Sequence, residues 1–254
     1  MKRKRFDIVD AIVFTVAVYV VTVAIQIYQP TTGGYFNLGE SVIYLAALLR
    51  GPWIAGFAGG VGAALADVST GYGIFAPGTL IIKFIEGLVA GFLVEHFRKT
   101  SGAILSIVVG GVYTILLLVF AMYYWVGEVF FGPETYLAWN ITETFGSTTI
   151  YLPLTLWIIL ALVIGSATTY VLFKKYIHQS EALLLLVAGS LMVLGYFLYE
   201  YYISNPLMGI PSINALAEIP INIGQAVIGA SIAIPVAGWL RRAGYGKQST
   251  SSKY

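Results

Sequence analysis

The sequence has few of the residues that a water-exposed surface requires. Only 10% of its 254 residues are charged, whereas 58% are hydrophobic. A soluble domain carries about 25% charged residues. A soluble enzyme, a nucleic-acid-binding protein and a disordered linker are therefore poor interpretations of this chain.

Side chains that bind metals or act as nucleophiles are also scarce. The chain has no cysteine, which excludes disulfide bonds, thiolate metal sites and cysteine nucleophiles. Its two histidines, His96 and His178, both lie near basic residues at the ends of apolar segments. ATPase, metalloprotease and serine-hydrolase motifs are missing from the sequence. We therefore expect no enzyme activity, no metal site and no cofactor.

Long apolar runs make up most of the chain. A membrane-spanning helix needs roughly 20 mostly apolar residues. Five uncharged runs are long enough: Ala11–Tyr28, Gly102–Val126, Ile150–Phe173, Ala182–Tyr199 and Ile219–Leu240. A sixth run, Gly78–Val94, is interrupted by Lys83 and Glu86. These six runs predict a polytopic, all-α membrane protein.

A further apolar stretch is broken in its middle by Arg50-Gly51-Pro52. Because proline cannot continue the hydrogen-bond ladder of a helix, we expect two short helices here, Phe36–Leu49 and Trp53–Ala66. If both cross the membrane the chain has eight spans, which is the count we favour. If they form a re-entrant hairpin, the count is six.

The basic residues indicate how the chain is oriented. With eight spans and the N-terminus inside, 13 of the 14 Lys and Arg residues lie on the inner side and only Lys83 lies within a span. Positive flanking residues are retained in the cytoplasm. We therefore predict a multi-pass protein of the cell membrane with both termini cytoplasmic. The longest outer loop, Gly127–Thr149, is acidic and has no basic residue.

Ionisable side chains in the spans or at their edges are the candidate functional groups. Each costs at least ~2.5–3.5 kcal/mol at a helix centre and persists where it finds a partner or a polar cavity. Lys83 and Glu86 are three residues apart and therefore share a helix face. They form either an internal ion pair or a contact to a ligand. An exposed helix cap is the simpler interpretation of Glu40, Asp67 or Glu200 taken singly, but all three are predicted at the outer membrane level.

A polar stripe begins the last predicted span. Glu218, Asn222 and Gln225 are spaced by four and three residues, which places them on one helix face. A carboxylate beside two amides offers the acceptors and donors that a polar heterocyclic ligand needs. Hydrogen bonding between helices is the alternative role. Aromatic residues at the same level, Tyr72 among them, fit either an interfacial belt or stacking on a flat ligand.

Small residues recur every four positions in two of the predicted helices. Gly56 and Gly60 form one such pair, and Gly87 and Gly91 form another. This spacing lets helices approach closely. We therefore expect these glycines to serve helix packing.

Taken in order, several segments resemble the substrate-binding S components of energy-coupling factor (ECF) vitamin transporters. Asn37–Pro52, which contains Gly39-Glu40-Ser41 and ends in Arg50-Gly51-Pro52, resembles the second helix of that family. The pattern continues through Gly59–Asp67, Gly71-Tyr72, Pro77–Gly87, Met192–Glu200 and Glu218–Gln225.

The resemblance implies a compact helical protein that captures a vitamin or vitamin precursor from outside. It implies partners as well: a transmembrane T component and two cytoplasmic ATPase subunits, with no nucleic acid. The small-molecule ligand would bind a set of nine residues, namely Glu40, Asp67, Tyr72, Lys83, Glu86, Glu200, Glu218, Asn222 and Gln225. The family has six spans, so residues 102–174 would be an inserted transmembrane hairpin on a six-helix core within a single membrane domain, 1–254.

Two departures leave another function open. The family often uses small residues at four-residue spacing on its first helix to meet the T component, whereas Ala11 and Thr15 are the best such pair here. The inserted hairpin would also offer a docking surface for other proteins and for membrane lipid. A non-transport accessory subunit of a larger membrane complex is therefore the alternative function.

Overall fold

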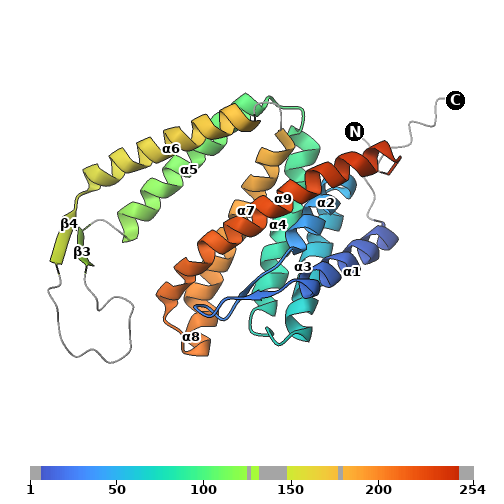
Figure 1. The fold of residues 1–254 in the computed structure, drawn as a ribbon, viewed down its shortest axis with the longest axis horizontal. Helices are drawn as coiled ribbons and strands as arrows, with labels where there is room; N and C mark the ends of the chain where they lie inside the picture. Colours follow the sequence, from blue (N-terminus) through green and yellow to red (C-terminus); the bar gives the residue numbers. More distant parts are fainter. Residues whose placement is uncertain (1–6, 125–126, 132–147, 177–179, 246–254) are drawn as a thin grey trace. The chain divides into compact units, whose positions relative to one another are not determined.

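The computed structural model describes residues 7–124, 127–131, 148–176 and 180–245. These residues are mostly α-helical, with two pairs of short antiparallel strands (Figure 1). The chain divides into two compact units, one made of residues 1–100 and 179–254 and the other of residues 101–178. The predicted mostly helical fold is confirmed.

The first unit contains the elements before and after residues 101–178. Its N-terminal part consists of α1 (Ile8–Ala24), β1 (Ile27–Tyr28), β2 (Tyr35–Phe36), α2 (Gly39–Arg50), α3 (Pro52–Ser69) and α4 (Ala76–Phe97). Its C-terminal part consists of α7 (Ser180–Tyr199), a π-helical turn (Glu200–Ser204), α8 (Asn205–Met208), a 3-10 helix (Ser212–Ala217) and α9 (Glu218–Arg242). β1 and β2 form a hairpin that the sequence analysis did not predict.

The predicted helix break at Arg50-Gly51-Pro52 is confirmed. Gly51 has a positive φ of 91°, a conformation that glycine adopts without a steric penalty. Its backbone N–H donates to the carbonyl oxygen of Ala46 and closes α2. Pro52 then begins α3, where its missing N–H is not needed. The short α2 and the longer α3 therefore follow one another with a single residue between them.

Glycines bring α3 and α4 into close contact, as their spacing predicts. A Cβ on Gly60 would lie 2.6 Å from the backbone oxygen of Leu80, and one on Gly56 would lie 2.9 Å from that of Phe84. On the facing side, Gly87 and Gly91 leave the same kind of room for the backbone of α3. Side chains at these positions would push the two helices apart.

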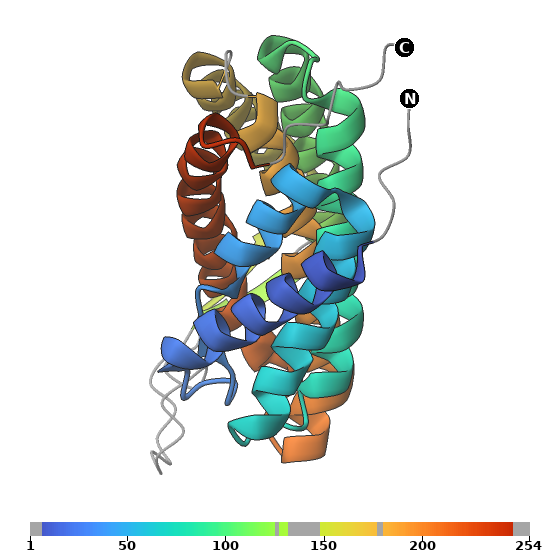
Figure 2. The ribbon, with the colours of Figure 1, turned by 90° about the vertical axis from the view of Figure 1, so that its right-hand side faces the viewer.

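The other helices of the first unit pack around this pair. α1 contacts α3 and α2 (Figure 2), α4 contacts α7, and α9 contacts both α2 and α7. The interior contains apolar side chains, among them Ile43 and Leu183, which are fully buried. It also contains buried charged and amide side chains near one end of these helices, and these form the candidate site described below.

The second unit is a helical hairpin. α5 (Gly102–Tyr124) packs against α6 (Leu154–Tyr176), and β3 (Gly127–Phe131) pairs with β4 (Thr148–Leu152). These strands lie in and next to the segment predicted to be an outer loop. The rest of that acidic loop lies outside the described residues. The hydroxyl of Ser106 donates to the carbonyl oxygen of Gly102 in its own helix.

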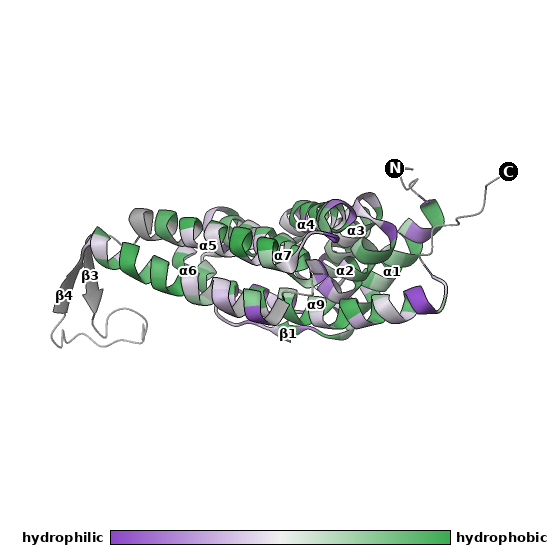
Figure 3. Ribbon diagram, turned by 90° about the horizontal axis from the view of Figure 1, so that it is seen from above, coloured by the Kyte–Doolittle hydropathy of each residue, from purple (hydrophilic) through white to green (hydrophobic). Residues whose placement is uncertain are grey.

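Three helical segments of the described residues are long and apolar enough to cross a membrane: Ala76–Phe97, Ser180–Met208 and Ser212–Arg242. α1 and parts of α5 and α6 are apolar but shorter. Hydrophobic residues run along the helices of each unit (Figure 3). The chain is therefore a helical membrane protein, while the eight-span count and the six-helix core stay predictions.

Candidate functional site

The buried polar side chains of the first unit surround one cavity. Its wall is formed by α1, the segment around β2, α3, α4, α7 with its π-helical turn, and α9. Six of the nine predicted site residues line it: Asp67, Lys83, Glu200, Glu218, Asn222 and Gln225. The cavity is narrow, with a volume of about 30 Å³. A ligand larger than a few waters therefore requires the wall to open.

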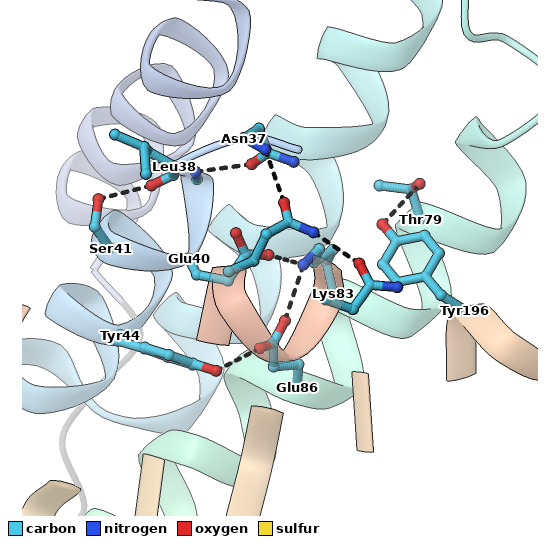
Figure 4. A network of polar contacts seen from close by, with 12 residues as sticks. Asn37, Leu38, Glu40, Ser41, Tyr44, Thr79, Lys83, Glu86 and Tyr196 are labelled. Atoms are coloured by element: carbon cyan, nitrogen blue, oxygen red, sulfur yellow. Dashed lines mark hydrogen bonds and ion pairs between the residues drawn. The ribbon is translucent and has the colours of Figure 1, made fainter. Parts of the chain in front are cut away.

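Lys83 joins two further predicted residues to the cavity wall (Figure 4). Its ammonium group forms ion pairs with Glu40 of α2 and, at 3.3 Å, with Glu86 of its own helix. Tyr44 donates a hydrogen bond of 2.7 Å to the other oxygen of Glu86. The ring of Tyr196 lies 5.3 Å from the ammonium nitrogen. Both carboxylates thus hold Lys83 in place, and the predicted Lys83–Glu86 pair is confirmed.

Asp67 at the end of α3 is bound by a tyrosine of the hairpin. The Tyr35 hydroxyl donates a hydrogen bond of 2.5 Å to Asp67 Oδ1. Burial, and then the negative charge of Asp67, raise the pKa of Tyr35 well above its ordinary value. The phenol therefore keeps its proton at physiological pH and remains a donor to the carboxylate. The second oxygen, Asp67 Oδ2, is buried without a hydrogen bond from the described residues.

The predicted stripe on α9 faces the same cavity. Gln225 accepts a hydrogen bond of 2.9 Å from the backbone N–H of Asn37, and its amide donates one of 2.7 Å to Asn222 Oδ1. Thr32 in the hairpin turn donates to Glu218. The start of α9 is thus tied to the segment around β1 and β2 by side chains that line the cavity.

Glu200 has the fewest partners of the predicted residues. It begins the π-helical turn after α7 and is 3% exposed. Its Oε2 atom has no hydrogen-bond partner among the described residues. Its carboxyl group interacts electrostatically with that of Glu218. The described residues contain no group of three or more His, Cys, Asp or Glu arranged to hold a metal ion.

The interpretation of single acidic residues as exposed helix caps is wrong, because Glu40, Asp67 and Glu200 are only 0%, 2% and 3% exposed. Tyr72 is the most peripheral of the predicted residues. Its ring lies against that of Tyr35, with ring centroids 4.4 Å apart. Tyr72 is not among the described residues that line the cavity.

Several residues of the cavity wall were not in the predicted set: Thr22, Tyr35, Asn37, Thr79 and Tyr196. Tyr35 and Tyr196 share the predicted outer membrane level with the acidic residues, and this signal would have included them. Thr79 accepts a hydrogen bond of 3.0 Å from Tyr196. Thr22 is one of two threonines in an apolar helix, and nothing in the sequence distinguishes it from Thr15, whose hydroxyl bonds its own backbone.

Comparisons with known proteins match this chain to a transporter family. The family model described as "ECF-type riboflavin transporter, S component" matches residues 7–150, which is more than half of the chain. The matched region runs from the start of α1 through α5 and ends before α6. A protein of Pyrococcus woesei, described as "Uncharacterized protein in gap 3'region", is 41% identical over 117 residues, which are 46% of this chain and 75% of that protein.

Proposed function

The chain belongs to the family of ECF-type riboflavin transporter S components, and on that premise we propose that it captures a vitamin-type small molecule from outside the cell for an ECF-type importer. The observation that carries this proposal is the convergence of nine buried polar side chains, four of them ionisable, on one cavity. A helical membrane protein without a site has no reason to retain so many ionisable groups at one level.

The cavity wall provides the contacts that such a ligand needs. Asp67, Glu200 and Glu218 offer carboxylate acceptors, while Asn222 and Gln225 offer amide donors and acceptors. Lys83 supplies the cation of the wall. In this proposal Glu40 and Glu86 act through Lys83 by fixing the position of its ammonium group.

The aromatic residues define the outer side of the proposed site. Tyr35 lines the cavity, and Tyr72 packs on its ring from the loop after α3. Movement of this pair together with the β1–β2 hairpin would open the cavity to a flat ligand. Riboflavin, the compound in the family's name, is the first ligand to test.

Gentle co-purification with mass spectrometry tests the proposed function. The chain, tagged and extracted in mild detergent from its native membrane, should bring with it a T component and two ATPase subunits. Denaturing the same preparation should release a small molecule of the vitamin class. A preparation that contains other membrane proteins, and no ATPase subunits or released ligand, would favour the accessory-subunit function instead.

Capture of a ligand from outside the cell also requires the predicted topology. A cysteine introduced at Ser147 should react with a membrane-impermeant thiol reagent from outside, and one at Ser180 only from inside. The native chain has no competing thiol. The reverse labelling pattern would contradict both the positive-charge argument and the direction of import.

A further inference from the structure

Acidic groups outnumber basic groups in the cavity wall. The wall contains three carboxylates, Asp67, Glu200 and Glu218, and one ammonium group, that of Lys83. Lys83 is already paired with Glu40 and Glu86, which lie behind it. No ion pair within the described ranges reaches the three wall carboxylates. The positive charge that would balance them does not come from the described part of the protein.

Of the three wall carboxylates, that of Glu200 is the least compensated. Asp67 receives a hydrogen bond from Tyr35, and Glu218 receives one from Thr32. Glu200 is 3% exposed, its Oε2 atom has no hydrogen-bond partner among the described residues, and it lines the cavity. Its charged neighbour is Glu218, which has the same sign and adds repulsion.

A buried carboxylate without a partner is unfavourable unless something compensates its charge. Removal of an ion from water is offset where the group takes up a proton, or where an opposite charge and hydrogen bonds replace the lost hydration. A second carboxylate beside it raises that requirement. A ligand with a positively charged nitrogen at this end of the cavity would supply both the charge and the hydrogen-bond donors.

We infer that the ligand of this cavity is an organic cation, and that Glu200 and Glu218 bind its positively charged nitrogen. This inference rests on the proposed function and names the chemical class of the ligand. The fitting groups are a protonated amine, an amidinium or a heteroaromatic ring with a quaternary nitrogen. Asn222 and Gln225 then bind the polar edge of the same molecule, since both amides lie on the α9 face that carries Glu218.

Binding assays on the purified full-length protein test this inference with charged and uncharged probes. Thiamine and pyridoxamine are the cations, and riboflavin and pyridoxine are the uncharged compounds. Pyridoxamine and pyridoxine form a matched pair, because an aminomethyl group in one replaces a hydroxymethyl group in the other. Calorimetry at pH 7 should show at least one cation binding ten times more tightly than either uncharged compound.

Two conservative variants locate the charge. Glu200→Gln keeps the shape of the side chain and removes its charge, so it should weaken binding of the cation at least tenfold. Glu181→Gln is the control, because Glu181 begins the same helix at its other end and pairs with Arg241 away from the cavity. That variant should bind as the unaltered protein does. Glu218→Gln repeats the measurement if Glu200→Gln fails to fold.

The remaining outcomes separate the inference from the proposed function. If riboflavin or pyridoxine binds most tightly, and neither Glu200→Gln nor Glu218→Gln weakens that binding, the ligand is not a cation. The proposed function then stands. If the unaltered protein binds none of the four compounds at millimolar concentration, the organic-cation inference is contradicted, and the co-purification experiment decides the proposed function separately.

Discussion

Lys83 of α4 and Glu40 of α2 form an ion pair in which neither side chain is more than 2% exposed. With Glu86, this pair places two carboxylates around one ammonium group in the interior of a membrane protein. Removing one partner of a buried ion pair leaves an uncompensated charge, which costs about 3–5 kcal/mol. The contact is therefore part of the stability of the first unit as well as of the site.

Replacing Lys83 by Met should lower the free energy of unfolding by about 3–5 kcal/mol, because Glu40 and Glu86 would lose their cation. Unfolding in detergent, followed by tryptophan fluorescence, measures the change. Adding Glu40→Gln and Glu86→Gln to the same chain should restore part of the stability, since no buried charge then remains.

A partly exposed ion pair provides the comparison for Lys83. Arg50 and Asp10 lie 2.7 Å apart, but their side chains are 27% and 28% exposed. Arg50→Met should cost about 1 kcal/mol or less. Equal losses in Lys83→Met and Arg50→Met would show that burial does not strengthen the Lys83 contacts.

The close approach of α3 and α4 leads to a second prediction. A Cβ at Gly60 would lie 2.6 Å from the backbone oxygen of Leu80, so Gly60→Ala should separate the helices and cost about 1–3 kcal/mol. Gly238 of α9 has nothing within 4 Å of the position that a Cβ would take. Gly238→Ala should therefore be neutral or stabilise the helix by up to ~1 kcal/mol. Thermal unfolding in one detergent compares both variants, and a neutral Gly60→Ala would contradict the packing argument.

The sequence predicts those parts of the fold that depend on neighbours along the chain. The helix break at Arg50-Gly51-Pro52 follows from backbone chemistry, and the Lys83–Glu86 pair follows from helical spacing. The Gly56/Gly60 contact follows from residue size. Each of these needs only a few consecutive residues, and the structure confirms each of them.

Contacts between distant segments could not be predicted in this way. Glu40 reaches Lys83 because α2 and α4 lie side by side, and Thr22 lines the cavity because α1 packs on α3. Spacing within one helix carries no information on either. The β1–β2 hairpin was missed because two-residue strands have too little alternation to detect. The predicted outer level shared by acidic and aromatic residues was the one long-range signal, and three of the acidic residues at that level, Asp67, Glu200 and Glu218, line the cavity.

Asn222 tests whether the α9 stripe binds a ligand. Asn222→Leu would remove the acceptor of the hydrogen bond from Gln225 and leave a buried amide without its partner. If Asn222 also bonds the ligand, leaving that ligand group without its partner costs about 1–3 kcal/mol, which corresponds to a tenfold to hundredfold loss of affinity. Binding of the compound that co-purifies with the protein measures the effect. Ser231→Ala is the control, because the exposed Ser231 hydroxyl bonds its own helix. If Asn222→Leu binds the compound as tightly as Ser231→Ala, the stripe serves helix packing only.

The helical hairpin of residues 101–178 is expected to be dispensable for ligand binding. The residues that line the cavity come from outside this segment. Within it, the hydroxyls of Thr114 and Thr169 donate hydrogen bonds of 2.8 Å to carbonyl oxygens of their own helices. Hydroxyl groups satisfied in this way need no ligand. The apolar outer surfaces of α5 and α6 fit contact with lipid or with a partner protein.

Deleting residues 101–173 and joining the ends through a short Gly/Ser linker should preserve ligand affinity within about threefold, which corresponds to less than ~1 kcal/mol. The deletion is feasible because the predicted topology places both ends of the hairpin on the cytoplasmic side, between two pairs of basic residues. The family match extends through α5 to residue 150, so the deletion also asks whether that part of the match reflects ligand binding. Size-exclusion chromatography and cysteine labelling at Ser180 would show that the shortened protein is folded and correctly inserted. A shortened protein that passes both checks and no longer binds its ligand would place the hairpin in the binding site, and its peripheral assignment would then be wrong.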